Sequence, residues 1–311
     1  MSDLTITETT FEGWKSLQLQ TGRFVVTAPL EVGPRFMEFR RPDGKNLFYQ
    51  FPGQQGGKNE EDHQLRGGHR LWHSPEHEVR TYQPDNTAVS VDHGARGFRL
   101  QGPLEEKTGM EKSLGVEVLG NDTLKIEHSL TNHGMWPVPC AAWPLTMLRR
   151  GGVGVVPFFP KGEHPRDLLP NMAMVPWTYT DLSAPCWKFR SSYLAIDTAV
   201  AETPQKLGFT NYPGWSAYWL NGDTFVKYAV PPKANETYPD LGCCFETFCN
   251  DSLIELETLS PLVSLGPQET IRHDEYWTLI PGLPSPLEEK DYLEGLFPAV
   301  SQWLKNLPQN D

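Results

Sequence analysis

The chain has 311 residues, of which 38% are hydrophobic and 10 are tryptophan, so it can bury a large core. Its formal net charge of −12 disfavours nucleic acid or an anionic membrane as a partner, but it does not disfavour a small neutral ligand. No apolar run reaches membrane-spanning length, and the first residues lack the charged and apolar segments of a signal peptide. We therefore expect a cytoplasmic protein that binds neither nucleic acid nor membrane.

The five cysteines, an odd number, fit reduced thiols better than a disulfide framework. Cys243, Cys244 and Cys249 cluster in the sequence, but they lack the Cys-x-x-Cys spacing that is typical of structural zinc sites. We expect no metal and no cofactor.

Short strand-like segments recur between turn residues from Thr5 almost to Leu279. Turns such as Asn221-Gly222-Asp223 contain residues that adopt positive φ at little cost. This pattern predicts an all-β antiparallel sandwich that forms a single domain over residues 1–311. Strands are predicted at residues 23–28, 35–39, 88–92, 114–119, 123–130, 193–197, 216–220, 224–230 and 275–280.

A polar, glycine-rich stretch at residues 53–62 is predicted to be a long loop, and it leads into an unusual segment at residues 65–76. In that segment, guanidinium groups suit hydroxyls or a carboxylate, imidazoles titrate near neutrality, and an indole offers a flat face to a sugar ring. The alternative is a polar loop that stabilises itself by ion pairs. Histidines at every fourth residue would suggest a metal on a helix, but Pro75 argues against that helix. The candidate residues are Arg66, His69, Arg70, Trp72 and His73.

Later stretches add weaker candidates. Trp143 follows a proline-rich turn, where it either stacks on a ligand or fills the core. Lys206 and Lys227 flank a hairpin rich in aromatic residues, although isolated lysines are usually solvated. Asp240 precedes the predicted strand that contains Glu246. We include Lys227 and Asp240 among the candidate substrate-binding residues.

The most informative stretch is residues 254–261, a predicted buried strand with two glutamates two residues apart. Because side chains alternate along a strand, Glu255 and Glu257 share one face, opposite Ile254 and Leu256. Like charges so close together raise each other's pKa, and burial raises both further. The pattern alone leaves two interpretations open, a functional pair or the solvated face of an antiparallel sheet.

The last segment, residues 285–307, is the exception to the β pattern. Its apolar residues recur at helical spacing although Pro298 interrupts them, which predicts one or two short helices lying on a sheet. These apolar residues are Leu293, Leu296, Phe297, Val300 and Leu304.

Taken in chain order, these motifs resemble those of the galactose mutarotase (aldose 1-epimerase) superfamily. Residues 65–68 (Leu-Arg-Gly-Gly) are similar to the family's Leu-His-Gly-Gly, and residues 142–145 (Ala-Trp-Pro-Leu) to its His-Pro-Tyr-Phe. Residues 256–258 (Leu-Glu-Thr) resemble the Leu-Glu-Thr-Gln that carries the general base. Over the whole chain the likeness is closest to an uncharacterised branch that lacks the usual catalytic histidines. The resemblance implies a large antiparallel β-supersandwich and a carbohydrate ligand.

In that family a Glu removes the anomeric hydroxyl proton while a His protonates the ring oxygen, which opens the sugar. By resemblance, Glu257 fits the first role. The family's histidines are replaced here by Arg66 and Trp143, and neither a guanidinium nor an indole donates a proton usefully near pH 7. The resemblance therefore implies that His69 or His73 has become the acid, or that mutarotation has been lost.

The leading hypothesis is a mutarotase- or epimerase-like enzyme for a sugar or a sugar acid, with Glu257 as base and His69 or His73 as acid. The alternatives are a non-catalytic sugar-binding or sensor protein, and a glycan lyase or hydrolase on the same fold. We expect a small carbohydrate as partner and a monomer or homodimer. The predicted substrate-binding residues are Arg66, Arg70, Trp72, Trp143, Glu255, Lys227 and Asp240.

Overall fold

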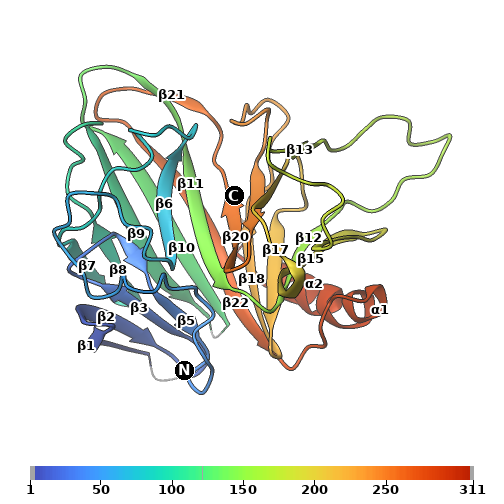
Figure 1. Ribbon diagram of the computed structural model, residues 1–311, viewed down its shortest axis with the longest axis horizontal. Helices are drawn as coiled ribbons and strands as arrows, with labels where there is room; N and C mark the ends of the chain where they lie inside the picture. Colours follow the sequence, from blue (N-terminus) through green and yellow to red (C-terminus); the bar gives the residue numbers. More distant parts are fainter. Residues whose placement is uncertain (1–3, 121, 309–311) are drawn as a thin grey trace.

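The computed structural model describes residues 4–120 and 122–308, and its strands form three antiparallel sheets (Figure 1). The 4-stranded sheet is built from the N-terminal part of the chain, in blue at the lower left of Figure 1. Its order is β1 (Thr5–Phe11), β2 (Trp14–Gln20), β3 (Val25–Pro29) and β5 (Glu38–Arg40).

The 10-stranded sheet is the largest of the three. In order, its strands are β14 (Trp187–Phe189), β15 (Tyr193–Asp197), β12 (Val153–Pro157), β17 (Trp215–Leu220), β18 (Asp223–Ala229), β22 (Thr270–Pro281), β10 (Thr123–Asn132), β9 (Met110–Leu119), β8 (Gly97–Gln101) and β7 (Ser90–Gly94). A short 3-10 helix, η1 (Thr198–Val200), follows β15.

The 8-stranded sheet carries the residues that matter most below. In order, its strands are β13 (Met174–Pro176), β16 (Gln205–Phe209), β19 (Phe245–Cys249), β20 (Leu253–Thr258), β11 (Val138–Arg149), β6 (His69–Ser74) and β4 (Arg35–Phe36), and β21 (Val263–Leu265) pairs with β11.

The main core lies between the 10-stranded and 8-stranded sheets, because one cluster of buried apolar side chains draws on both. Ile254 and Leu256 of β20 belong to that cluster together with Ile126 of β10 and Trp277 of β22. Alternation then turns Glu255 and Glu257 to the other face of the 8-stranded sheet, as the sequence predicts. We call that other face the outer face.

The C-terminal segment folds into helices that cover the 10-stranded sheet, in red at the lower right of Figure 1. It consists of α1 (Glu289–Asp291), a π-helical turn η2 (Tyr292–Leu296) and α2 (Phe297–Lys305). Pro298, which has no N–H to donate, lies just after the π-helical turn η2, and the helical segment continues through it. Val300 and Trp303 pack with Trp215 and Tyr276 of the sheet, so the predicted helical segment is confirmed.

The sequence located most strands correctly but missed some boundaries. The β17–β18 hairpin turns at Asn221 (φ 52°) and Gly222 (φ 88°), which confirms the predicted turn. The predicted strand at residues 35–39 is in fact split, because β4 pairs in the 8-stranded sheet while β5 pairs in the 4-stranded sheet. None of the helices in residues 4–120 and 122–308 is long and apolar enough to cross a membrane.

Candidate functional site

Five neighbouring strands, from β16 to β6, place a group of charged and aromatic side chains on the outer face. The strand register sets Glu257 of β20 opposite Glu246 of β19 and opposite Leu145 of β11. Lys206 comes from β16, the next strand beyond β19. We call the group the outer cluster, and its members are Lys206, Glu246, Glu255, Glu257 and the indoles of Trp72, Trp143 and Trp177.

Glu257 is fully buried and is held through one of its two carboxylate oxygens. Its Oε2 accepts a hydrogen bond from Trp143 Nε1 at 2.8 Å and another from Lys206 Nζ at 2.9 Å. Its Oε1 is also buried and accepts no hydrogen bond from an N–H or hydroxyl group of the described residues, while the Glu255 carboxyl group lies within hydrogen-bonding reach of Glu257. Leaving a buried charged oxygen unpaired is costly, so this atom is a natural acceptor for a ligand hydroxyl.

Lys206 is the cation of the outer cluster, and it is almost completely buried. Its Nζ lies 2.7 Å from Glu246 Oε2 and 4.8 Å from the ring centroids of both Trp143 and Trp177. Burial alone would favour the neutral amine, but Glu257 and Glu246 raise the pKa of Lys206 well above its usual value. Lys206 therefore keeps its proton and orients Glu257.

Glu255 differs from Glu257 in two ways. It keeps part of its surface exposed, and it lacks a direct ion pair with Lys206 among the contacts of the described residues. Burial of its carboxyl group and the nearby charge of Glu257 together raise the pKa of Glu255 to about 8. At neutral pH Glu255 therefore keeps its proton, beside the Glu257 carboxyl group that Lys206 binds.

The predicted arginines are buried and already paired. Arg70 lies with Cζ 4.2 Å from the Trp72 ring centroid, and its Nη2 is 2.8 Å from His63 Nε2. Arg66 donates to Glu60 Oε2 at 2.6 Å and to Asn86 Oδ1 at 2.9 Å. Arg70 lines the outer face through its contact with Trp72, whereas Arg66 braces the preceding loop.

The two predicted acid histidines lie on the opposite side of the sheet from Glu257. Along β6, Arg70 and Trp72 face outward, so His69 and His73 face the interior, and both are buried. His69 stacks on Phe36, a residue of the main core. Their placement does not bring either imidazole to the outer cluster.

His69 instead belongs to a polar network inside the sandwich, which also contains the predicted substrate-binding residue Lys227. We call this the inner network, and its members are His69, His128, Thr146, Lys227, Thr258, His273, Glu275 and Trp277. Lys227 Nζ lies 2.8 Å from Glu275 Oε1 and donates to Thr146 Oγ1 at 2.9 Å. Burial would raise the pKa of Glu275, but Lys227 lowers it below its usual value.

One proton assignment satisfies the chain of bonds that leads away from Lys227. Because Lys227 only donates, Thr146 Oγ1 accepts from it and donates to His69 Nδ1 at 2.9 Å. His69 then donates from Nε2 to His128 Nε2 at 2.7 Å, and His128 donates from Nδ1 to the carbonyl oxygen of His273 at 2.8 Å. Burial lowers the pKa of His128 to about 4, which agrees with this neutral chain.

The inner network also contains a group with metal-ligand geometry. The ligating atoms of His69, His128 and Glu275 lie within 4.8 Å of one another. The Nε2 atoms of His69 and His128, however, are hydrogen-bonded to each other, and the Glu275 carboxylate forms an ion pair with Lys227. A divalent cation would have to displace both interactions beside an ammonium group, so the geometry favours a hydrogen-bonded structural network.

Asp240 lies at the edge of the outer cluster. Its Oδ2 accepts from Ser74 Oγ at 3.3 Å, and its charge contributes to the raised pKa of Glu246, of which burial is the main cause. The structure thus brings Arg70, Trp72, Trp143, Glu255, Glu257 and Asp240 to one face, and places Arg66, His69, His73 and Lys227 elsewhere.

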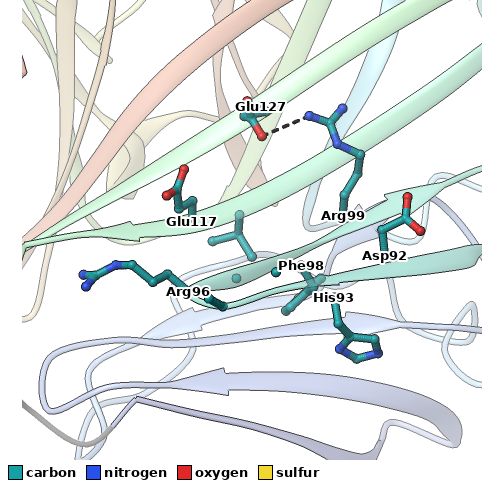
Figure 2. Close-up of a pocket in the computed structure, with 11 residues that line it drawn as sticks. Asp92, His93, Arg96, Phe98, Arg99, Glu117 and Glu127 are labelled. Atoms are coloured by element: carbon teal, nitrogen blue, oxygen red, sulfur yellow. Dashed lines mark hydrogen bonds and ion pairs between the residues drawn. The ribbon is translucent and has the colours of Figure 1, made fainter.

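The hollow drawn in Figure 2 lies over β7 to β10 and is separate from the outer cluster. Arg99 and Glu127 project into it and pair with each other at 3.0 Å. Both side chains are partly exposed, and β7 and β8 form the far edge of the 10-stranded sheet. We interpret this hollow as a solvated surface groove.

No protein-family model matches the chain, and no curated protein matches it. A solved galactose mutarotase-like protein from Lactobacillus casei superposes with a TM-score of 0.59 at 7% identity, over 85% of this chain and 100% of that one. A galactose mutarotase-like protein from Clostridium acetobutylicum gives 0.57 at 11% identity, over 90% of this chain and 99% of that one. A TPR-domain containing protein from Parabacteroides distasonis gives 0.58 at 13% identity over 88% of this chain, which spans 48% of that protein. The chain has the galactose mutarotase-like fold.

The mutarotase-like fold confirms the predicted antiparallel supersandwich with its short C-terminal helical segment. Sequence reasoning undervalued Lys206 and Glu246 and did not single out Trp177. The segment Phe245-Glu246-Thr247-Phe248 was an available signal, because Glu246 is the one charged residue in a strand that is otherwise uncharged. The contact of Trp177 with Lys206 joins a residue just after β13 to β16, and no local pattern encodes it.

Proposed function

We propose that this mutarotase-like chain is a carbohydrate isomerase that exchanges the anomers of a free sugar, with Glu257 as its base. The proposal rests on how the two oxygens of the Glu257 carboxylate are hydrogen-bonded. Trp143 and Lys206 fix Oε2, while Oε1 is buried and accepts no hydrogen bond from an N–H or hydroxyl group in the part of the chain that the structure describes. An anomeric hydroxyl that donates to Oε1 would satisfy that atom and place its proton for transfer.

The aromatic side chains of the outer face support a sugar ligand. Trp72 and Trp143 pack edge to face with ring centroids 5.4 Å apart, and Tyr179 is exposed beyond Trp177. Indole and phenol rings offer apolar faces to the C–H groups of a sugar, while carboxylates accept its hydroxyls. Tyr179 lies close enough for Lys206 to influence its titration, so it belongs to the same neighbourhood.

The charges favour an uncharged sugar over a sugar acid or a sugar phosphate. Lys206 forms ion pairs with Glu246 and Glu257. The Arg70 guanidinium lies over the Trp72 ring and is hydrogen-bonded to His63. An anionic group would therefore meet no free cation among these residues and would face carboxylates instead. Of the sugar or sugar acid that the sequence allowed, we therefore favour the uncharged sugar.

A second candidate function is sugar binding without catalysis. The ion pair between Lys206 and Glu257 favours it, because the pair holds the Glu257 carboxylate in place to accept a hydrogen bond from a sugar hydroxyl without any proton transfer. Such a protein would bind the same sugars without changing the rate of anomer exchange.

Saturation-transfer NMR measures binding and anomer exchange in one sample. The panel comprises D-glucose, D-galactose, D-glucosamine, D-glucuronic acid and D-glucose 6-phosphate. We expect accelerated exchange for an uncharged member of the panel, and a loss of at least about 100-fold in Glu257→Gln with binding retained. Full activity in Glu257→Gln would remove this residue from the mechanism, and binding without exchange in the wild type would support the second candidate.

A further inference from the structure

The reaction proposed above needs a proton donor as well as a base. The ring oxygen must gain a proton when its bond to the anomeric carbon breaks. His69 and His73 lie on the interior side of β6, away from Glu257. Lys206 is held by two carboxylates that raise its pKa, so it is a poor donor near neutral pH.

Glu255 occupies the position that such a donor requires. It projects from β20 on the same face as Glu257, two residues away, and adjacent same-face residues of a strand have Cα atoms about 6.6 Å apart. The hydroxyl and ring oxygens on an anomeric carbon can bridge two carboxyl groups at such a spacing. Of the two glutamates, Glu255 is the one that keeps exposed surface, so it also faces the side from which a ligand would arrive.

The surroundings of the Glu255 carboxyl group differ from those of Glu257. Its register neighbours on the two adjacent strands, Met147 and Phe248, are apolar and remove water from its flanks. The charged or titratable groups that influence it are Glu257 on its own strand, Lys206 on β16, Arg70 on β6 and Tyr179 after β13. Lys206 and Trp143 both bind Glu257, so the charge of the pair is fixed on that residue.

We propose that Glu255 is the general acid of this site, an inference that rests on the proposed function. In the forward step, Glu257 removes the proton from the anomeric hydroxyl, the bond between the anomeric carbon and the ring oxygen breaks, and a carbonyl forms at that carbon. The ring oxygen takes the proton of the Glu255 carboxyl group. The bond between the anomeric carbon and the next carbon then rotates, and the hydroxyl that was the ring oxygen attacks the other face of the carbonyl. Glu257 returns its proton to the carbonyl oxygen, and the attacking hydroxyl returns its proton to Glu255.

The charge of the site supports this division of roles. The two glutamates share one proton before the step and one proton after it, because Glu257 gains a proton as Glu255 loses one. The summed charge that Lys206 and Arg70 must balance therefore stays constant during ring opening. The raised pKa of Glu255, about 8, keeps its carboxyl group protonated at the start.

The test is the pH dependence of anomer exchange for wild type and Glu255→Gln, with the panel sugar that exchanges fastest. We expect the wild-type rate to fall above about pH 8, as Glu255 ionises. Glu255→Gln should lose about 100-fold in kcat near pH 7 with little change in KM, and the alkaline fall should vanish. Glu255→Asp, which keeps a carboxyl group, should retain part of the rate and the alkaline fall.

Control variants separate the possible failures. Glu127→Gln makes the same chemical change on the 10-stranded sheet and should leave the rate and the profile unchanged. Exchange in the wild type together with an unaltered rate and profile in Glu255→Gln overturns this inference but leaves the base in place. Absence of exchange in the wild type overturns both this inference and the proposed function.

Discussion

A lysine is buried against glutamate on each side of the 8-stranded sheet, the inner pair coming from β18 and β22 of the facing 10-stranded sheet, but the two arrangements are completed differently. Inside the sandwich, Glu275 Oε1 accepts from Lys227 and from Thr258, and Oε2 accepts from Trp277 at 2.8 Å. On the outer face, Glu257 Oε2 is similarly bound, but Oε1 accepts no hydrogen bond from an N–H or hydroxyl group of the described residues. A network with every group satisfied stabilises and specifies a structure, whereas an unsatisfied buried oxygen marks a place for a ligand.

The largest expected effect is on the free energy of unfolding when either buried lysine is replaced. Lys227→Met would leave the Glu275 charge buried without its cation, so we expect the free energy of unfolding to fall by about 3–5 kcal/mol. Lys206→Met should cost less, about 1–3 kcal/mol, because Trp143 still donates to Glu257 and Glu246 can take up a proton. Urea unfolding at pH 7 measures both. Equal losses for the two variants would erase the distinction between the faces.

The second effect is the response of the inner network to acid. Burial lowers the pKa of His128 and of His273 to about 4, below the value of about 6.5 for an unfolded chain. Between these pH values the unfolded state binds more protons, so stability falls as the pH falls. Each such histidine contributes about 1.4 kcal/mol per pH unit within this window. Urea unfolding of the Glu255→Gln variant between pH 7 and pH 5 measures the slope without the opposing titration of Glu255, and a flat profile would contradict a neutral inner network.

The smallest effect has the opposite sign and belongs to the outer face. The pKa of Glu255, about 8 in the folded protein, exceeds the value of about 4.3 in an unfolded chain. The folded state therefore binds more protons between these values, and wild-type stability is lost as the pH rises through them. Relative to wild type, Glu255→Gln should gain about 1–3 kcal/mol on going from pH 5 to pH 8.5. A constant difference between the two proteins would show that Glu255 is not protonated in the fold.

Local patterns in the sequence predicted the strands and helices well, but they did not predict which of these elements contact one another. The two-residue period of β20 placed Glu255 and Glu257 on one face, because strand alternation depends only on neighbouring residues. The same rule applied to β6 would have separated His69 from Arg70, but the sequence alone did not identify residues 69–74 as a strand. The partners of Lys206 come from β19 and β20, some 40 to 51 residues away, and only the sheet order brings them together.

The hydrogen bond from Trp143 to Glu257 also gives the protein a built-in spectroscopic reporter. Among the 10 tryptophans, Trp143 is the one whose indole N–H donates to this carboxylate. A proton that is hydrogen-bonded to a charged oxygen resonates downfield, and it moves upfield when that oxygen is neutralised. The indole resonance of Trp143 therefore follows the charge on Glu257 directly, in a protein that carries no label.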